Sequence, residues 1–485
     1  MTETAQAVHR EADRDCPACG VRLTDGGRHV TWCAACDWNV DPEEQDEQAP
    51  GRIERLRRRL ARRYGEQLFT ELSGATASPG AVASPGAVAS PGAVASPGAV
   101  ASPGAVASPA GDGRGNEGSG AAGSPAAAVT SPRRLGAAGG LAAALAVMVH
   151  AVTVALLTGG LWLLVAEWGR GLLPALGGLM IGLAVVLRPR FQRLSRLAGD
   201  RPVLRRTDAP GLFALLDEIA GHVGTSGVRA VLVGPEVNAS VTVYGTRQHR
   251  VLSLGLGLWH VMTPQERIAL LGHEFGHYAH GDTRHGLLVG TALDSLETWR
   301  YTLAAKRADS LMDHFVNLMT APPRLLVDGV LAVLEHLTLR DTQRAEYLAD
   351  SSAALVGGSA AAAGVMDRLL VGGGVDGELR REIVAARTRI GGARRREEPA
   401  AGLWERLAAF GATIPPHEYE RRRRVAERRG HQVDSTHPPT HLRRRRLAEG
   451  ERTEALIELD PVRSARIEAE LAAPARRVAE ELVRG

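Results

Sequence analysis

The stretch TPQERIALLGHEFGHYAHGD, residues 263–282, decides how the 485-residue chain folds around its most informative motif. It contains the pattern HExxH as His273-Glu274-Phe275-Gly276-His277. On a helix this pattern places two imidazoles one turn apart on one face, with a carboxylate beside them. These groups are suited to be two zinc ligands and a general base. Because an isolated HExxH also arises by chance, the surrounding sequence has to support the site.

A helix start lies directly before the motif. Thr263 and Glu266 have the spacing of a capping box, and Pro264 occupies the first helical position. We therefore expect a helix that begins at Pro264 and presents His273 and His277 from one face.

A catalytic zinc needs a third protein ligand and an open position for water. Glu346 and Asp350 lie four residues apart on an apparently helical stretch. Glu346 could complete the site, and Asp350 could accept a hydrogen bond from a ligand imidazole. A Glu/Asp pair at this spacing is also common on solvated helix faces, and spacing alone does not separate the two interpretations.

The cysteines form a second candidate metal site. All four lie in the first 36 residues, as the CxxC pairs Cys16, Cys19 and Cys33, Cys36. Four thiolates match the closed tetrahedral site of structural zinc, and so small a segment cannot fold on apolar burial alone. The alternative is two disulfides in an oxidising compartment, but the N-terminus has no signal peptide. We expect a zinc-ribbon-like module in residues 1–45.

Two further segments precede the first apolar run. Residues 46–73 contain apolar residues at spacings of three and four opposite a strongly basic face, which predicts a basic amphipathic helix. The basic face of this helix is either solvated or in contact with a partner or the membrane surface. The hexapeptide Ala-Ser-Pro-Gly-Ala-Val then repeats in tandem, and this composition predicts a linker over residues 74–134.

Two almost uncharged runs, residues 135–165 and 171–187, come next. Each is near the length that crosses the hydrocarbon core, with a buried core hairpin as the alternative. We expect a two-helix transmembrane hairpin in residues 135–190. Arginines flank both outer ends, so the positive-inside rule places the N-terminus and the catalytic domain in the cytoplasm, beneath a cell membrane crossed by two spans.

Three features of the remaining sequence have more than one interpretation. His150, inside the first run, is either functional or packed between helices. Residues 325–339 carry Asp328, Glu335 and His336, which favours a packed or surface-docked helix over a further span. The arginine runs at 421–424 and 443–446 are typical of solvated faces or of contact with anionic lipid, and we expect no nucleic acid partner.

The fold class follows from the pattern after residue 200. Helix-like and strand-like periodicities alternate at first, and helices dominate later. We expect a mainly α protein with a small β-sheet, with one α+β domain in residues 200–450 and a C-terminal helical tail in residues 451–485. The predicted early elements are a helix at 210–222 and strands at 228–233, 240–244 and 251–254.

Several motifs in a fixed order resemble the HtpX-like and CAAX prenyl protease group of membrane zinc metallopeptidases, gluzincins with HExxH and a downstream ExxxD. They are Asn238-Ala239-Ser240, residues 251–256, the HExxH helix with Gly281-Asp282, and residues 346–350. The late segment from Ser435 to Arg443, STHPPTHLR, is similar to the His-Pro motif and following arginine of that group. The resemblance covers roughly residues 205–446 and implies that the α+β domain in residues 200–450 is a zincin-like zinc metallopeptidase domain.

The resemblance implies roles for individual residues. A catalytic zinc would be bound by His273, His277 and Glu346, with Glu274 as general base and Asp350 behind the ligands. His437 and Arg443 would lie near the substrate oxyanion. The strand at Asn238, Ala239 and Ser240 would hold substrate backbone as an added β-strand.

We therefore expect a membrane-anchored zinc metalloendopeptidase that hydrolyses peptide bonds with a zinc-activated water and Glu274 as base, acting on membrane or misfolded proteins. One alternative is CAAX-type processing of C-terminal peptides. Another is a non-proteolytic, membrane-tethered zinc-binding regulatory protein in which the cysteine module is the active part. The expected cofactors are one catalytic and one structural zinc, and the expected partners are a polypeptide substrate and membrane lipid. The sequence names no partner for the module.

Overall fold

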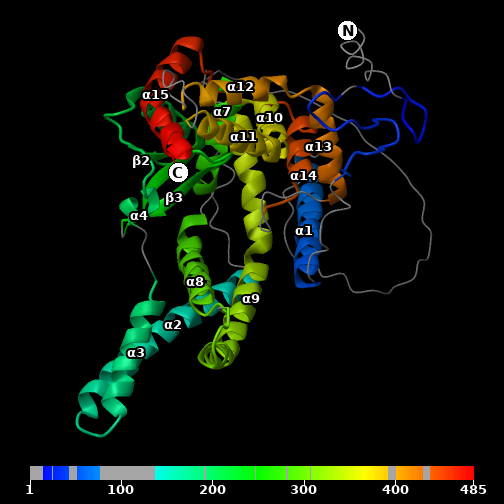
Figure 1. Cartoon of the computed structure of the whole chain (residues 1–485). Helices are drawn as coiled ribbons and strands as arrows, with labels where there is room; N and C mark the ends of the chain where they lie inside the picture. Colours follow the sequence, from blue (N-terminus) through cyan, green and yellow to red (C-terminus); the bar gives the residue numbers. More distant parts are fainter. Residues whose placement is uncertain are drawn as a thin grey trace, which may run out of the picture.

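The chain is mainly helical and contains one small mixed sheet, as the sequence predicts (Figure 1). The computed structural model describes residues 15–24, 26–42, 52–76, 137–189, 193–245, 247–279, 282–305, 307–390, 400–429 and 437–484. The strands are β1 (Val203–Leu204), β2 (Ala230–Gly234), β3 (Ala239–Tyr244) and β4 (His249–Gly255). The helices are α1 (Arg52–Thr76), α2 (Ala137–Ala166), α3 (Leu173–Leu187), α4 (Leu194–Ala198), α5 (Pro210–Val223), α6 (Leu256–Trp259), α7 (Pro264–Ala279), α8 (Asp282–Thr302), α9 (Leu311–Gly357), α10 (Ser359–Leu370), α11 (Gly372–Ile390), α12 (Leu403–Thr413), α13 (Pro416–Arg429), α14 (Thr440–Glu449) and α15 (Pro461–Arg484).

The sheet has the order β1-β2-β4-β3 and leaves β3 at an edge. β2 and β4 are parallel, whereas β3 runs antiparallel to β4 with Val241 opposite Leu252. Every residue of β2 is buried, because a central strand is covered on both faces. On an antiparallel edge strand, alternate residues direct their N–H and C=O groups away from the sheet, and Val241 is such a residue.

The capping box predicted at the start of α7 is confirmed. The Thr263 N–H donates to Glu266 Oε2 at 2.8 Å, and the Glu266 N–H donates to Thr263 Oγ1 at 3.2 Å. The helix begins at Pro264 and buries Ile268, Leu271 and Phe275 in the main core. Both histidines of the motif are therefore fixed on a helix with a defined start.

The C-terminal helix α15 contributes to the same core. Ile467, Leu471 and Val478 are buried there. The Glu470 carboxylate accepts hydrogen bonds from the N–H groups of Gly211 and Leu212 at 2.8 and 2.9 Å. These N–H groups in the first turn of α5 have no partner within the helix, so the Glu470 carboxylate of α15 caps α5.

The helices α7 and α9 approach each other closely because glycines lie at their contact. A Cβ on Gly276 would lie 2.8 Å from the Cα of Ala349, and a Cβ on Gly357 would lie 2.7 Å from the backbone nitrogen of Ala269. Neither position has room for a larger side chain. This close contact is what allows α9 to reach the histidines of α7.

Four helices, α2, α3, α8 and α9, extend from one side of the part that contains the sheet and α7 (Figure 1). α2 and α3 form the predicted hairpin, and α8 and α9 pack against α2. Their shared cluster includes Val149, Leu296 and Leu331. His150 Nε2 lies 3.2 Å from Thr291 Oγ1 of α8, which supports the interpretation of His150 as a residue packed between helices.

The second span, predicted at residues 171–187, stays a prediction. α3 has 15 residues, about 22 Å of helix, which is short for a hydrocarbon core of about 30 Å. By length and composition, α2 and the 47-residue α9 are the two helices of the described chain that could cross a membrane. The stretch 325–339, expected as a packed or surface-docked helix, has apolar side chains of both kinds. Leu325, Leu326 and Val333 are exposed, whereas Val327, Leu331 and Leu334 are buried.

Gly276→Ala tests the contact between α7 and α9. Alanine normally stabilises a helix relative to glycine, but here the added Cβ meets the backbone of α9, and we expect a loss of about 1–3 kcal/mol. Gly221→Ala in α5 is the matched control, because a Cβ there meets nothing within 4 Å. Thermal unfolding of the detergent-solubilised variants measures the difference. Equal midpoints for the two variants would contradict the packing described.

Candidate metal centre and active site

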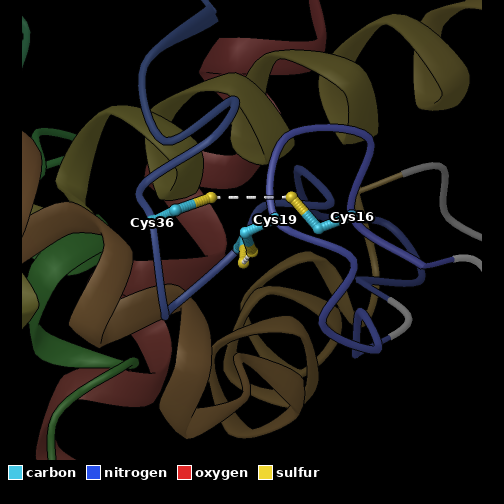
Figure 2. A group of neighbouring side chains, drawn as sticks. Cys16, Cys19 and Cys36 are labelled. Carbon is cyan, nitrogen blue, oxygen red and sulfur yellow. Dashed lines mark hydrogen bonds between the residues drawn. The ribbon is translucent and has the colours of Figure 1, made fainter.

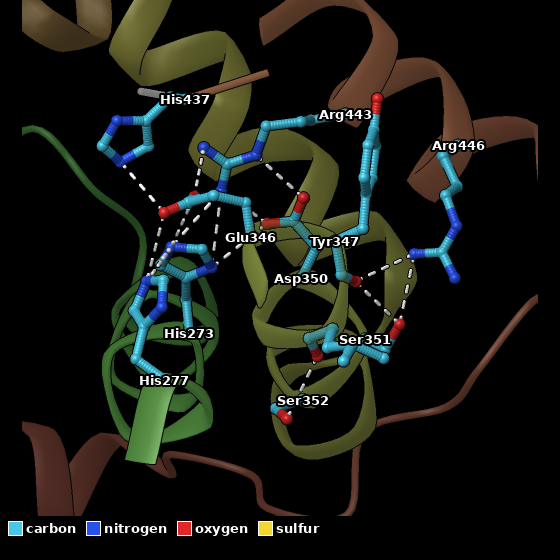
Figure 3. Close-up of polar contacts among 11 residues, drawn as sticks. His273, His277, Glu346, Tyr347, Asp350, Ser351, Ser352, His437, Arg443 and Arg446 are labelled. Carbon is cyan, nitrogen blue, oxygen red and sulfur yellow. Dashed lines mark hydrogen bonds and ion pairs between the residues drawn. The ribbon is translucent and has the colours of Figure 1, made fainter. Parts of the chain in front are cut away.

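Three side chains from two helices converge on one point (Figure 3). The Nε2 atoms of His273 and His277 on α7 lie 3.2 Å apart. Each of these nitrogens lies 3.5 Å from a carboxylate oxygen of Glu346 on α9. The structure thus brings together all three residues that the sequence proposes as ligands, and they could hold a metal ion.

The donor set fits zinc in spacing and in chemistry. Bonds of about 2.0–2.1 Å in a tetrahedron place neighbouring donors about 3.3–3.4 Å apart, close to the separations observed. Burial, together with the neighbouring His273, lowers the pKa of His277 to about 4, so its imidazole is neutral and has a lone pair at physiological pH. Two imidazoles and one carboxylate are a set typical of zinc.

A buried ion-pair cluster supports the ligands from behind. Asp350 Oδ1 lies 3.1 Å from His273 Nδ1, the geometry of a carboxylate that orients a metal-ligating imidazole. Arg443 donates two hydrogen bonds to the Asp350 carboxylate, from Nε at 2.8 Å and from Nη2 at 2.6 Å. Its Nη1 lies 3.0 Å from Glu346 Oε2. One guanidinium therefore holds two carboxylates of α9 in place.

The resemblance implies that Arg443 lies near the substrate oxyanion, and this role stays a prediction. Its side chain is almost fully buried, and its guanidinium faces Glu346 and Asp350. The geometry makes Arg443 a residue that positions the carboxylates. His437 is different, because its Nε2 lies 3.1 Å from Glu346 Oε1 and its side chain is 23% exposed, so it borders the open side of the site.

Glu274 lies between the ligands and the edge of the sheet. Its Oε2 accepts a hydrogen bond of 3.1 Å from the N–H of Val241 in β3. Burial raises the pKa of Glu274 to about 7, with a further contribution from Glu346. A carboxyl group with a pKa near neutrality can both accept and return a proton.

Tyr278, the residue after the second histidine of the motif, also contacts the edge strand. Its hydroxyl donates a 2.6 Å hydrogen bond to the carbonyl of Val241. Together Glu274 and Tyr278 contact both outward-facing backbone groups of Val241, and they fix α7 against β3. A tyrosine directly after the second histidine of the motif was the available signal.

The predicted substrate strand lies where the sequence places it. Ala239 and Ser240 begin β3, and the Asn238 carbonyl accepts a hydrogen bond from the Gly255 N–H at 3.0 Å. Ser240 is exposed, as an edge strand allows. Gly281, Ser435 and Thr436, which belong to the motifs of the resemblance, lie outside the described residues.

The four cysteines also converge (Figure 2). The Sγ atoms of Cys16 and Cys36 lie 3.6 Å apart, as do those of Cys19 and Cys33. Zinc–sulfur bonds of about 2.3 Å in a tetrahedron give sulfur separations of about 3.8 Å, so the group fits one structural zinc.

The two CxxC loops share one backbone conformation. In each, the N–H four residues after the first cysteine donates to that cysteine's carbonyl at 2.8 Å, from Gly20 and from Asp37. These two residues both have positive φ, 73° and 58°. This repeated geometry is typical of a pair of zinc knuckles. Each of the two short sulfur–sulfur distances joins a cysteine of the first CxxC pair to a cysteine of the second.

The ion-pair cluster predicts a loss of stability in acid. Burial alone would raise the pKa values of Asp350 and Glu346, but Arg443 opposes this, and the pKa of Asp350 lies well below its usual range while that of Glu346 is about 2. Carboxyls with a lowered pKa in the folded state add stability above their unfolded pKa of about 4, and this stability is lost as the pH falls below it.

We expect the wild type to lose at least about 1 kcal/mol more unfolding free energy between about pH 5 and pH 3 than the double variant Asp350→Asn, Arg443→Met. Denaturant unfolding in the presence of a chelator measures this, so that zinc release does not contribute. Parallel pH curves for the two proteins would show that the cluster has no such effect.

Comparison with known proteins agrees with this geometry. Residues 214–451 match peptidase family M48. A protease HtpX homolog from Syntrophobacter fumaroxidans (strain DSM 10017 / MPOB) is 22% identical over 157 residues, which are 31% of this chain and 55% of that protein. The match thus spans about half the length of this curated relative. No solved structure matches the chain.

The matched region begins within α5 and ends just after α14, so it contains both helices that carry the candidate ligands. Metallopeptidases of this family use zinc, in keeping with the donor set of His273, His277 and Glu346. Over residues 214–451 the chain is therefore similar to peptidase family M48, and it resembles HtpX-like membrane zinc metallopeptidases.

Proposed function

We propose that this protein is a zinc metalloendopeptidase that cleaves peptide bonds of membrane or misfolded proteins at the site between α7 and β3. The observation that supports it most is the convergence of His273, His277 and Glu346 next to Glu274, directly beside an edge strand. His273, His277 and Glu346 would hold the zinc. When bound, zinc supplies Lewis-acid activation of water and of the scissile carbonyl.

Glu274 has the position and the pKa of the general base. It takes a proton from the attacking water as the water oxygen bonds to the carbonyl carbon, and it returns that proton to the leaving amine as the C–N bond breaks. Its burial raises its pKa to about 7, which suits both steps. His437, whose side chain is partly exposed beside Glu346, would donate to the oxyanion that develops on the carbonyl oxygen.

The edge strand β3 offers the binding mode for the substrate. An extended peptide can add to an edge strand through backbone hydrogen bonds, with little dependence on its sequence. Residues from Asn238 to Val243 would provide these groups, and Val241 lies beside Glu274. Such recognition suits unfolded segments of many proteins.

The position of the site suggests where these substrates come from. α9 is one helix that carries the apolar segment 311–339 and, seven residues later, Glu346. Seven residues of helix correspond to about 10 Å. The site would therefore lie close to the membrane surface, and by the positive-inside rule on its cytoplasmic side.

Two other functions are distinguished by experiment. A CAAX-type peptidase would release short C-terminal peptides, which mass spectrometry of the products would identify. A regulatory protein whose active part is the cysteine module would keep its function when the catalytic glutamate is replaced.

Glu274→Gln tests the proposal. The amide cannot take a proton, so we expect kcat/KM for unfolded casein to fall by about 10²- to 10⁴-fold, while zinc content is unchanged because Glu274 is not among the proposed ligands. Glu405→Gln, at an exposed carboxylate on α12, is the matched control and should cleave at the wild-type rate. Undiminished cleavage by a zinc-loaded Glu274→Gln protein would refute the proposed role.

A further inference from the structure

The N-terminal helix α1 packs directly on the turn of α9 that carries Glu346, although the repeat linker separates the two in sequence (Figure 1). Gln343 Nε2 donates to the Ala61 carbonyl at 2.9 Å, and the Tyr347 hydroxyl donates to the Gly65 carbonyl at 3.1 Å. Gln343 and Tyr347 are completely buried and flank Glu346 in sequence. The helix predicted to be either solvated or bound to a partner thus covers the back of the candidate active site.

The same helix supports the segment that carries His437. A Cβ on Gly65 would lie 2.7 Å from Cδ of Pro439 and 3.6 Å from Cβ of Pro438. Proline rings are rigid, so this contact fixes the backbone that follows His437. His437 in turn contacts Glu346. α1 therefore touches both elements that border Glu346.

The cysteine module is attached to the catalytic domain through arginines of α13. Arg424 Nη1 donates to the Ala34 carbonyl at 2.7 Å and to Asp37 Oδ1 at 2.6 Å, and the guanidinium lies over the Trp32 ring at 5.0 Å. Arg428 Nη2 donates to the other oxygen of Asp37 at 2.6 Å. Ala34 and Asp37 belong to the loop that begins at Cys33, so these contacts follow the shape of the second CxxC loop.

Arg421 corrects the expectation that its run is solvated. It is 3% exposed, forms a bidentate ion pair with Glu418 and donates to the Val40 carbonyl at 2.9 Å. Loss of a partner would destabilise this arginine, since an unpaired buried charge is costly. The module supplies one of these partners.

Arg429 at the end of α13 links the module to α1. Its guanidinium pairs with Asp41, and its carbonyl accepts a 2.8 Å hydrogen bond from Arg62 Nη2 of α1. The module, α13, α1 and the turn around Glu346 therefore form one continuous series of contacts.

The fold of the module depends on its metal site. Its buried apolar cluster consists of Cys16, Leu23 and Cys33, too little to hold a fold by burial. Zinc bound by the four cysteines would supply that stability. Loss of this zinc would remove the ordered carbonyls that Arg421 and Arg424 bind.

We propose that the cysteine module and α1 act as an intrachain clamp that positions Glu346 and His437, so that zinc binding by the four cysteines strengthens zinc binding at His273, His277 and Glu346. The effect on cleavage rests on the proposed function, whereas the effect on zinc affinity does not. Coupling of this kind is reciprocal, so each site raises the affinity of the other.

The test compares Gly65→Leu with Gly74→Leu in the full-length protein. Both change one glycine of α1, but a Cβ on Gly74 meets nothing within 4 Å. Zinc affinity is measured by chelator competition, and the order of residues 343–350 by hydrogen exchange. We expect Gly65→Leu to weaken the catalytic-site zinc by about tenfold, to speed exchange and to lower cleavage. Gly74→Leu should match the wild type, and Cys16→Ser should act like Gly65→Leu.

Unchanged zinc affinity in Gly65→Leu and Cys16→Ser would overturn the clamp. Cleavage that rises when α1 is displaced would also overturn it, because the module would then be an obstruction. If Gly65→Leu fails to fold, Tyr347→Phe, which removes only the bond to the Gly65 carbonyl, should weaken zinc binding in the same direction. If the wild type cleaves nothing, the proposed function fails, but the zinc affinities still decide the clamp.

Discussion

The close contact between α7 and α9 is the constraint on which the rest of the structure depends. Glycines at 272, 276 and 357 let the two backbones approach until side chains of one helix meet the backbone of the other. At that separation Glu346 reaches both histidines, and Asp350 reaches the far nitrogen of His273. A larger residue at the contact would move α9 away from α7, and the donor atoms would no longer share one point.

The contact also buries charged side chains of α9, and these charges need partners. Two carboxylates without partners would be costly in the interior, and Arg443 offsets this by binding both. α14 is thereby bound to α9, and Arg446 strengthens the attachment by donating to the Tyr347 carbonyl at 3.0 Å. On the opposite side of α7, Glu274 and Tyr278 bind Val241 of the edge strand. The site is thus built from α7, α9, α14 and β3, each held by interactions with the next.

Local signals in the sequence predicted local structure well. The capping box predicted the start of α7, and strand-like periodicity predicted β2, β3 and β4. β1 was missed because a two-residue strand has no periodicity. The spacing of Glu346 and Asp350 did not distinguish ligands from a solvated face, and the resemblance to a family did. Some features depend on contacts between segments that are distant in sequence, so no local pattern predicts them. They are the burial of Arg421, the position of α1 and the exposed apolar face of α9.

The most direct test of the account is the zinc content of purified protein after replacement of Glu346, the ligand that α9 supplies. The wild type should hold two zinc equivalents, one in each candidate site. Glu346→Ala should hold one, and Asp341→Ala, at an exposed acidic residue of the same helix, should hold two. Two tightly bound equivalents in Glu346→Ala would contradict the claim that the contact of α7 with α9 completes the metal site.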